Sequence, residues 1–185
     1  MDAGLSSLDG AIQACEQAAI RVQLSLFVPS SVGAQLEPFR WVLDPVQAKL
    51  IPAHVTLCRE DEFAGLSLEA LQARLDAAEA AVIELRFGPA EVFAGHGVLL
   101  PCVAGSQAFQ DLRRRVLGSE AVREHAPHLT LAHPRNPRAV GNTAAALAEL
   151  PADLNIEFSV VSRIEQANGS KWRILQRYPL RKRER

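Results

Sequence analysis

The sequence predicts an α+β fold made of two similar halves. Residues 54–57 and 128–131 share one pattern, in which histidine, an apolar residue, threonine and another apolar residue follow each other. Each quartet lies between stretches whose apolar residues recur at helical spacing. Short runs that alternate between apolar and polar residues, as antiparallel strands do, separate these stretches. Together these observations indicate two motif strands, each flanked by helices.

The first half begins with a clear strand. Residues 20–28 alternate, so they form one apolar face and one polar face that also carries Phe27. A helix is expected over about residues 29–43. After the first motif, Ser67 is a candidate N-cap of a second helix. The apolar stripe of that helix consists of Leu68, Leu71, Leu75, Ala78 and Val82.

The second half repeats the alternation of strands and helices. Residues 83–87 and 98–103 predict two strands. A third helix is expected from about Ser106 to Gly118, with Arg113 and its two arginine neighbours pointing to solvent.

The last part of the chain predicts a helix and a hairpin. A short alanine-rich helix is expected over about residues 142–151. Two strands are expected over residues 154–165 and 171–179. Asn168 and Gly169 between them are a strong signal for a two-residue hairpin turn.

The length of the chain, 185 residues, suits one core or two small lobes that share one. We expect a single bilobal domain over residues 1–185, in which residues 1–19 form a short helical extension. No run of about 18 apolar residues and no basic segment before an apolar run is present, so neither a membrane span nor a signal peptide is expected. The three cysteines are odd in number and lack metal-ligand spacing, which suggests a reduced compartment, and we expect a cytoplasmic protein.

The net charge of −1 at pH 7 gives no general attraction for polyanions. The C-terminal end is locally basic, because residues 163–185 contain eight Lys or Arg against two Glu. A solvated strand face with a charged tail explains this composition, and contact with a phosphate backbone is the alternative.

Within each quartet, histidine and threonine lie on the same face, because side chains alternate along a strand. The two apolar residues then face a core. One such quartet is a weak signal, whereas two in matching strand contexts are a fairly strong one. The structural alternative is a pair of buried histidines bonded to backbone carbonyls. We interpret His54, Thr56, His128 and Thr130 as the candidate catalytic residues.

In these motifs the sequence resembles the 2H phosphoesterase superfamily, and within it the bacterial RNA 2',3'-cyclic phosphodiesterases, also called 2'-5' RNA ligases. The resemblance extends from about residue 21 to residue 180. It implies two lobes related by a pseudo-twofold axis, with two antiparallel sheets facing a central cleft and helices outside. It also implies a 2'-phosphate product. The chain departs from the family pattern at Ala53, where proline is common, and at His133, where many members carry arginine.

The motifs contain the groups that opening of a cyclic phosphodiester requires. One group must take a proton from the attacking water, and another must give one to the departing sugar oxygen. Histidine suits both roles because its reference pKa is near 6.5. Threonine hydroxyls can stabilise the non-bridging oxygens. By analogy we assign His128 as the base and His54 as the acid, and no metal or cofactor is expected.

Recognition of a nucleobase requires an aromatic surface and a few polar groups. Phe27 lies on the polar face of the first strand. A two-residue turn in the last hairpin predicts that Tyr178 lies opposite Ser159 and shares a face with Arg163 and Trp172. We therefore expect Phe27, Arg163, Trp172 and Tyr178 to bind the substrate.

The expected substrates are RNA ends or small cyclic nucleotides, and neither a membrane nor an obligate protein partner is expected. A 2'-5' RNA ligase, which would share the site, stays an alternative, as does a non-catalytic module that binds nucleotides or RNA. A metal-dependent hydrolase is disfavoured because no Asp or Glu cluster lies at ligand spacing from the motifs. Cys58 is expected to be a buried filler, and His133 to face away from the cleft on a regular strand.

Overall fold

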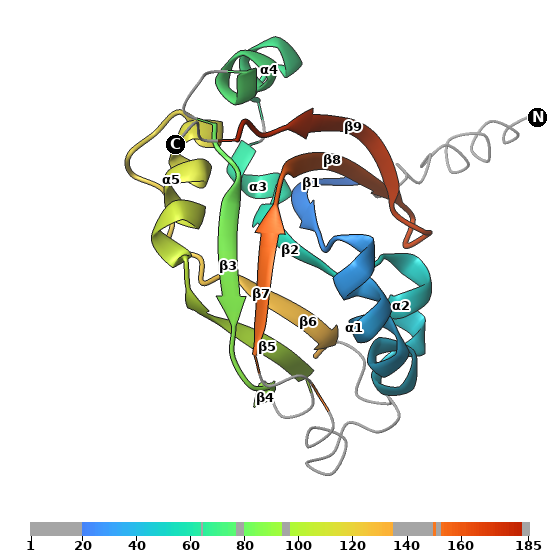
Figure 1. Ribbon diagram of the computed structural model, residues 1–185. Coiled ribbons are helices and arrows are strands. Elements are labelled where there is room, and N and C mark those ends of the chain that lie inside the picture. Colours follow the sequence, from blue (N-terminus) through green and yellow to red (C-terminus); the bar gives the residue numbers. More distant parts are fainter. Residues whose placement is uncertain are drawn as a thin grey trace, which may run out of the picture.

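The computed structural model of the protein describes residues 20–63, 65–76, 80–93, 97–134, 150 and 153–182 (Figure 1). Two antiparallel sheets form the centre of the fold, and helices lie around them. This confirms the expected α+β class with two antiparallel sheets. Residues 1–19 and nearly all of the helix expected over residues 142–151 lie outside the described residues, so the single domain stays a prediction.

The first sheet combines strands from both ends of the described chain. Its order is β2-β1-β8-β9. Alternation along β1 places Leu24 and Leu26 in the core, and Gln23 lies on the opposite face. The strand bounds are Ile20–Phe27 for β1, His54–Cys58 for β2, Val160–Ala167 for β8 and Arg173–Pro179 for β9.

The second sheet contains the other motif strand. β5 pairs with β4, β3 and β6, and β7 pairs with β3. β6 pairs with β5 alone among the described strands, just as β2 pairs with β1 alone. The bounds are Ile83–Phe87 for β3, Glu91–Phe93 for β4, Gly97–Ala104 for β5, His128–Ala132 for β6 and Leu154–Phe158 for β7.

The helices of the first half follow the strands of the first sheet. Asp44 ends α1 and caps α2, because its carboxylate accepts the N–H of Gln47. The predicted cap at Ser67 is confirmed, because its hydroxyl accepts the N–H of Ala70 in α4. The bounds are Ser30–Leu43 for α1, Pro45–Leu50 for α2, Glu60–Phe63 for α3 and Leu68–Asp76 for α4.

Helix α5 (Ser106–Leu117) lies between β5 and β6 in the chain. Its N-cap is Gly105, with a φ of 90°, and not Ser106. A side chain at Gly105 would meet the backbone oxygen of Glu84, so the close approach of β3 also requires glycine here. The helix ends at Gly118 in the left-handed region, as expected.

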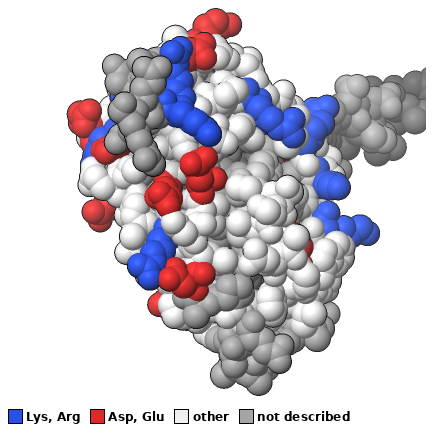
Figure 2. Space-filling model, viewed as in Figure 1, with Lys and Arg blue, Asp and Glu red and all other residues white. Residues whose placement is uncertain are grey.

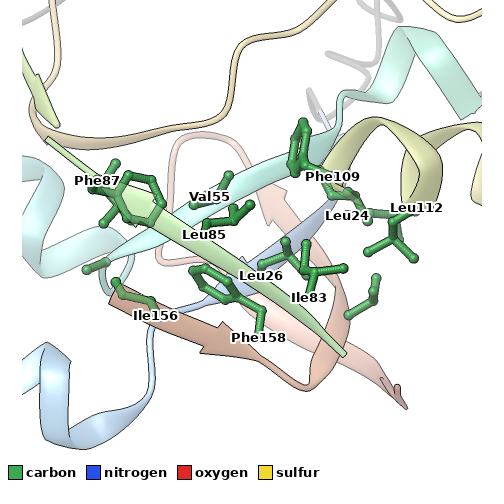
Figure 3. Packing of buried hydrophobic residues seen from close by; sticks show 14 of the residues in the cluster. Leu24, Leu26, Val55, Ile83, Leu85, Phe87, Phe109, Leu112, Ile156 and Phe158 are labelled. Carbon is green, nitrogen blue, oxygen red and sulfur yellow. The ribbon is translucent and has the colours of Figure 1, made fainter. Parts of the chain in front are cut away.

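One hydrophobic core joins the two sheets (Figure 3). Leu24 and Leu26 from the first sheet contribute to the same cluster as Leu85 and Phe158 from the second. These four side chains are at most 1 % exposed. The sheets are therefore held together by burial of apolar side chains, which is the main favourable term in folding.

The C-terminal hairpin is confirmed at its turn but differs in its strands. Asn168 and Gly169 both have positive φ, as a two-residue type I′ turn requires. The strand expected over residues 154–165 is divided at Ser159, so β7 belongs to the second sheet and β8 to the first. The pairing is displaced by one residue at Glu165, which lies opposite Arg173, and by another where β9 has an extra residue at Leu175. Tyr178 therefore lies opposite Val161, and the predicted pairing with Ser159 is wrong.

Two side chains expected at the surface or the cleft lie in the core. Arg113 on α5 is 0 % exposed, so it does not fan outward with its neighbours. Tyr178 on β9 is 1 % exposed and belongs to the core cluster. The expectation that Tyr178 binds substrate is therefore wrong, because the shifted register of β9 turns its ring toward the core.

The visible surface carries no large area of one charge. Figure 2 shows Lys and Arg side chains interspersed with Asp and Glu, with wide uncharged areas between them. Among the described residues, no helix combines the length and the apolar character that crossing a membrane requires.

Candidate active site

The two motif strands meet where the two sheets come together. β2 and β6 contact each other, although they belong to different sheets. Their histidines and threonines are half-buried, and the other residues of both strands are buried. His54, Thr56, His128 and Thr130 all line one cavity of about 400 Å³, which we call the cleft.

Each motif strand is interrupted by a register shift at the same place. In β2, consecutive residues of β1 pair with Thr56 and Cys58, so Leu57 is an extra residue. In β6, the extra residue is Leu131, in the equivalent position. Such a β-bulge bends the strand and redirects the side chains that follow. The chain thus repeats in its second half the local geometry of its first.

The bulges bring one more residue of each motif to the cleft. Arg59 and His133 both follow their motif histidine by five positions, and both line the cleft. The expectation that His133 faces away is wrong, because it assumed regular alternation. Cys58, two positions after Thr56, is 0 % exposed in the core, and burial raises the pKa of its thiol to about 12. Its interpretation as a buried filler is confirmed.

The two motif histidines are oriented in the same way. Nδ1 of His54 lies 2.9 Å from the carbonyl oxygen of Pro52, and Nδ1 of His128 lies 2.9 Å from that of Ala126. A carbonyl oxygen only accepts hydrogen bonds, so Nδ1 carries the hydrogen in both rings. Nε2 is therefore the nitrogen that each ring offers to a ligand, as a proton acceptor when the ring is neutral.

The surroundings of His54 favour its neutral form. Burial lowers the pKa of His54 to about 4, and the nearby charges of Arg40 and His128 act in the same direction. The hydrogen bond to Pro52 opposes this shift. Phe27 packs against the ring, with 5.9 Å between the ring centroids. At neutral pH His54 is therefore unprotonated and has a free Nε2 lone pair.

The threonine hydroxyls are available to a ligand. Thr56 and Thr130 line the cleft, each two positions after its histidine. Neither hydroxyl has a hydrogen-bond partner among the described residues. A hydroxyl can donate one hydrogen bond to an anionic oxygen. The cleft thus presents two Nε2 atoms and two hydroxyl donors.

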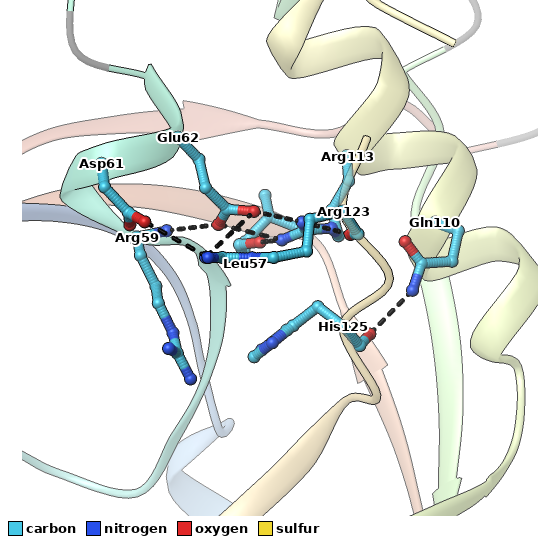
Figure 4. A network of polar contacts seen from close by, with 8 residues as sticks. All are labelled: Leu57, Arg59, Asp61, Glu62, Gln110, Arg113, Arg123 and His125. Atoms are coloured by element: carbon cyan, nitrogen blue, oxygen red, sulfur yellow. Dashed lines mark hydrogen bonds and ion pairs between the residues drawn. The ribbon is translucent and has the colours of Figure 1, made fainter. Parts of the chain in front are cut away.

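Arg59 adds a positive charge to the cleft. Its backbone N–H donates to the Glu62 carboxylate at 2.8 Å, but its side chain extends away from Glu62 and Asp61 (Figure 4). Those two carboxylates instead bind Arg113 and Arg123. In the part of the chain that the structure describes, the Arg59 guanidinium has no ion-pair partner. It can therefore bind an anion without breaking an existing contact.

A buried ion pair connects the first motif to the second. Arg113 on α5 contacts Glu62 on α3 at 2.5 Å and also donates to the carbonyl oxygen of Leu57 in β2 (Figure 4). Nη1 of Arg113 is the donor to Leu57. Nη2, which contacts Glu62, also donates to the carbonyl oxygen of Arg123, in the loop before β6. One fully buried guanidinium therefore links the bulge of β2 to the segment that leads into β6.

His125 lies behind the second motif histidine. Its ring centroid is 5.7 Å from that of His128 and 6.0 Å from that of Phe109. Burial lowers the pKa of His125 to about 4, and the charge of Arg113 contributes. Its Nε2 is buried without a hydrogen-bond partner among the described residues. A neutral ring at this position packs against His128 without adding a charge.

The sequence profile of the 2'-5' RNA ligase superfamily matches residues 28–167, which include both motif strands. The chain belongs to the 2'-5' RNA ligase superfamily. This is the family that the resemblance of the two motifs indicated. No curated protein matches the sequence.

Solved structures of this fold are similar to the chain over most of its length. TT0787 of Thermus thermophilus has a TM-score of 0.59 at 18% identity, and the match covers 89% of this chain and 100% of that protein. E. coli LigT complexed with 3'-AMP has a TM-score of 0.59 at 18% identity, with 87% and 98% covered. E. coli LigT complexed with NADP+ has a TM-score of 0.54 at 20% identity, with 86% and 96% covered. At these identities the likeness shows the shared fold.

The four residues expected to bind the substrate do not all line the cleft. Trp172 lines the cleft, and Phe27 lies beside His54 in a neighbouring pocket. Arg163 lines a separate cavity next to α4 and not the cleft, so its contact with substrate stays a prediction. Tyr178 lies in the core, as described above.

Sequence reasoning missed Arg59, although its equal spacing with His133 was a usable signal. Strand alternation alone would place both residues away from the cleft, and only the bulges reverse this.

Among the described residues, no group of three His, Cys, Asp or Glu side chains is arranged to hold a metal ion.

Proposed function

We propose that the protein is a phosphodiesterase that opens 2',3'-cyclic phosphates by acid–base catalysis with His54 and His128. The observation that carries this proposal is the equivalent orientation of the two imidazoles in one cleft. Each Nδ1 is bonded to the carbonyl oxygen two residues earlier, so each Nε2 is free. Two proton-transfer groups on different sheets can then act from different sides of one phosphate.

In this reaction a water oxygen bonds to phosphorus, and the bond from phosphorus to O3' of the ribose breaks. One Nε2 takes a proton from the water, and the other gives a proton to O3'. The product carries a 2'-phosphate and a free 3'-hydroxyl. Every proton that moves is accounted for by the two imidazoles and the water.

The lowered pKa of His54 favours it as the base of the hydrolytic reaction. An unprotonated imidazole can accept the proton of water, and burial keeps His54 in that form. The proton for O3' must then come from His128. This assignment is the reverse of the one expected by analogy from the sequence.

The remaining groups of the cleft suit the charge of the phosphate. The hydroxyls of Thr56 and Thr130 donate to the non-bridging oxygens, where negative charge concentrates. Arg59 supplies a guanidinium, which binds phosphate oxygens through two parallel hydrogen bonds. Trp172 offers an aromatic surface to the base. Structures of LigT with phosphate, 3'-AMP and NADP+ support a nucleotide as the ligand of this fold.

The same site can also join RNA ends when a 5'-hydroxyl takes the place of the attacking water. The two histidines then keep their roles, because one takes the proton of the 5'-hydroxyl and the other gives a proton to O3'. A 2'-5' RNA ligase would use the 2',3'-cyclic phosphate of one RNA and the 5'-hydroxyl of another. The superfamily description favours this as the second candidate. A binding module without catalysis is the third candidate, although both motifs are intact.

A cytoplasmic location fits the free thiols of Cys58 and Cys102.

Product analysis separates these functions. The protein is incubated with the four 2',3'-cyclic mononucleotides, with an oligonucleotide ending in a cyclic phosphate, and with that oligonucleotide plus a 5'-hydroxyl RNA. We expect 2'-phosphates from the first two incubations. A joined RNA as the main product would identify a ligase, and binding without any product would leave only a binding module.

A further inference from the structure

A second pocket lies next to the cleft and remains unused by the proposed reaction. It has a volume of about 810 Å³, against about 400 Å³ for the cleft. Ser162 and Ile174 place it on the first sheet, and Gly33 places it against α1. A pocket of this size accommodates a small ligand, and the cleft alone suffices for a mononucleotide.

Trp172 separates the pocket from the cleft. It lines both cavities, and its backbone N–H is bonded to the carbonyl oxygen of Leu50 at the end of α2, which fixes its position. The guanidinium of Arg21 lies 5.5 Å from the centre of its ring. Arg21 lines the cleft and not the second pocket, so it covers the ring from the cleft side. Trp172 itself also lines the second pocket, which Arg21 does not reach.

The apolar lining of the pocket reaches one of the motif histidines. Phe27 lines it and packs against the ring of His54. Phe27, Trp172 and Ile174 thus form an apolar surface that begins beside a proposed catalytic group. Ile174 is 38% exposed, which leaves its side chain accessible to a ligand.

The rim of the pocket is positively charged at β9 and the residues just before it. Lys171 and Arg177 line it, are exposed, and have no ion-pair partner among the described residues. Glu37 also lines the pocket, but its carboxylate is bound by Arg40 and by the N–H of Ala53. Glu157 is the other acidic residue of the lining. An aromatic surface beside free cations matches a nucleobase with its phosphate.

We propose that this pocket binds the nucleoside on the 5' side of the nucleotide that carries the cyclic phosphate. The base stacks on Trp172 and Phe27, and Lys171 and Arg177 bind the phosphate between the two nucleotides. This inference rests on the proposed function and narrows it, because the preferred substrate is then an RNA end and not a cyclic mononucleotide.

The test compares a 2',3'-cyclic mononucleotide with a dinucleotide that ends in the same cyclic phosphate. We expect kcat/KM to be about 10- to 100-fold higher for the dinucleotide, the usual range for one stacked base. Ile174→Asp and Arg177→Ala should each remove most of this preference and leave the mononucleotide rate unchanged. Added salt should weaken the preference of the wild-type protein, and it should weaken the remaining preference of Arg177→Ala less, because that variant keeps only Lys171.

Matched controls use the same substitutions elsewhere. Arg173→Ala removes an exposed arginine of β9 that pairs with Glu165 and lines neither cavity. Val103→Asp changes a side chain that is 58% exposed on the other sheet. Both variants should keep the preference. Equal rates for the two substrates in the wild-type protein would overturn the proposal, and so would Ile174→Asp or Arg177→Ala variants that lose both rates equally.

A binding measurement tests the pocket even if neither substrate reacts. Trp41→Phe leaves Trp172 as the single tryptophan of the chain. A dinucleotide 2'-phosphate should quench its fluorescence and bind about 10-fold more tightly than a mononucleotide 2'-phosphate. Equal affinities would contradict the second subsite, whereas the absence of turnover would contradict only the phosphodiesterase.

Discussion

Backbone carbonyl groups decide which nitrogen of each motif histidine meets a ligand. Pro52 and Ala126 both accept from Nδ1, so the two rings present Nε2 to the same cleft. Strand alternation predicted the histidines on the cleft face but carried no information on this hydrogen bonding, which depends on the bend of the chain before each strand. The same geometry in both halves indicates that the two rings have comparable roles toward a ligand in the cleft.

The lowered pKa of His54 predicts a displaced acidic limb in the pH profile. If His54 is the base, kcat/KM falls only when this ring becomes protonated, so its acidic limb should lie well below pH 6.5 and toward about 4. In kcat the limb should move to higher pH, because a bound anion favours the protonated ring. Rates measured from about pH 3.5 to 9 check this. An acidic limb at or above about 6.5 in kcat/KM would contradict His54 as the base.

Arg59 is predicted to bind the phosphate. Arg59→Ala should lower kcat/KM about 10- to 100-fold, the usual loss for a hydrogen bond to a charged group. Arg59→Lys should recover only part of it, because lysine lacks the paired donors of arginine. Arg86→Ala is the control, since Arg86 is exposed and pairs with Asp153 on the second sheet. Unchanged kinetics in Arg59→Ala would remove this residue from the site.

At the scale of the elements, the bulges explain which sequence predictions failed. Regular alternation placed His133 outside the cleft, and the structure places it in the lining. Alternation alone would also put Cys58 beside Thr56 in the cleft, whereas the structure buries it, as expected of a filler. A single extra residue in each strand causes this, at Leu57 and Leu131. Apolar periodicity does not reveal a bulge, because the extra residue is itself apolar and buried.

The buried Arg113 is predicted to be essential for joining α5 to the first motif. Arg113→Met should lower the free energy of unfolding by about 3–5 kcal/mol, because it removes the close partner of the nearly buried Glu62 and leaves only the more distant Arg123, at 3.7 Å. Adding Glu62→Leu should restore most of the loss, since no unpaired charge then remains. Urea unfolding of both variants measures this.

The control for this prediction is Arg114→Met on the same helix. Arg114 pairs with Asp111 at the surface, so its loss should cost less than about 1 kcal/mol. Equal effects of the two substitutions would show that the buried pair has no special role.

For the whole molecule, two neutral histidines make stability depend on pH. The pKa values of His54 and His125 are lowered to about 4 in the folded protein, against about 6.5 in an unfolded chain. The unfolded state then binds more protons between these values, so stability falls as the pH decreases from about 6.5 to 4. His125→Phe should reduce this slope measurably between about pH 6.5 and 4.5. A slope that is the same in His125→Phe and the wild-type protein would contradict a neutral His125.

The general plan of the molecule was readable from the sequence, and its local geometry was not. The repeated motif and the alternation of elements predicted the α+β class, and Asn168 and Gly169 predicted the final turn. The change of sheet at Ser159 and the burial of Arg113 depend on contacts between residues far apart in the chain. Such contacts leave no period in a single sequence, and the same holds for the pocket beside Trp172.

The most direct test of acid–base catalysis is turnover of a 2',3'-cyclic phosphate by His54→Ala and His128→Ala, followed by phosphorus NMR of the product. We expect each variant to lose about 10²- to 10⁴-fold in kcat, while substrate affinity is largely kept. The wild-type protein should form the 2'-phosphate and should be unaffected by a chelator. Full turnover in either variant, or wild-type activity that a chelator abolishes and zinc or manganese restores, would contradict the two-histidine mechanism.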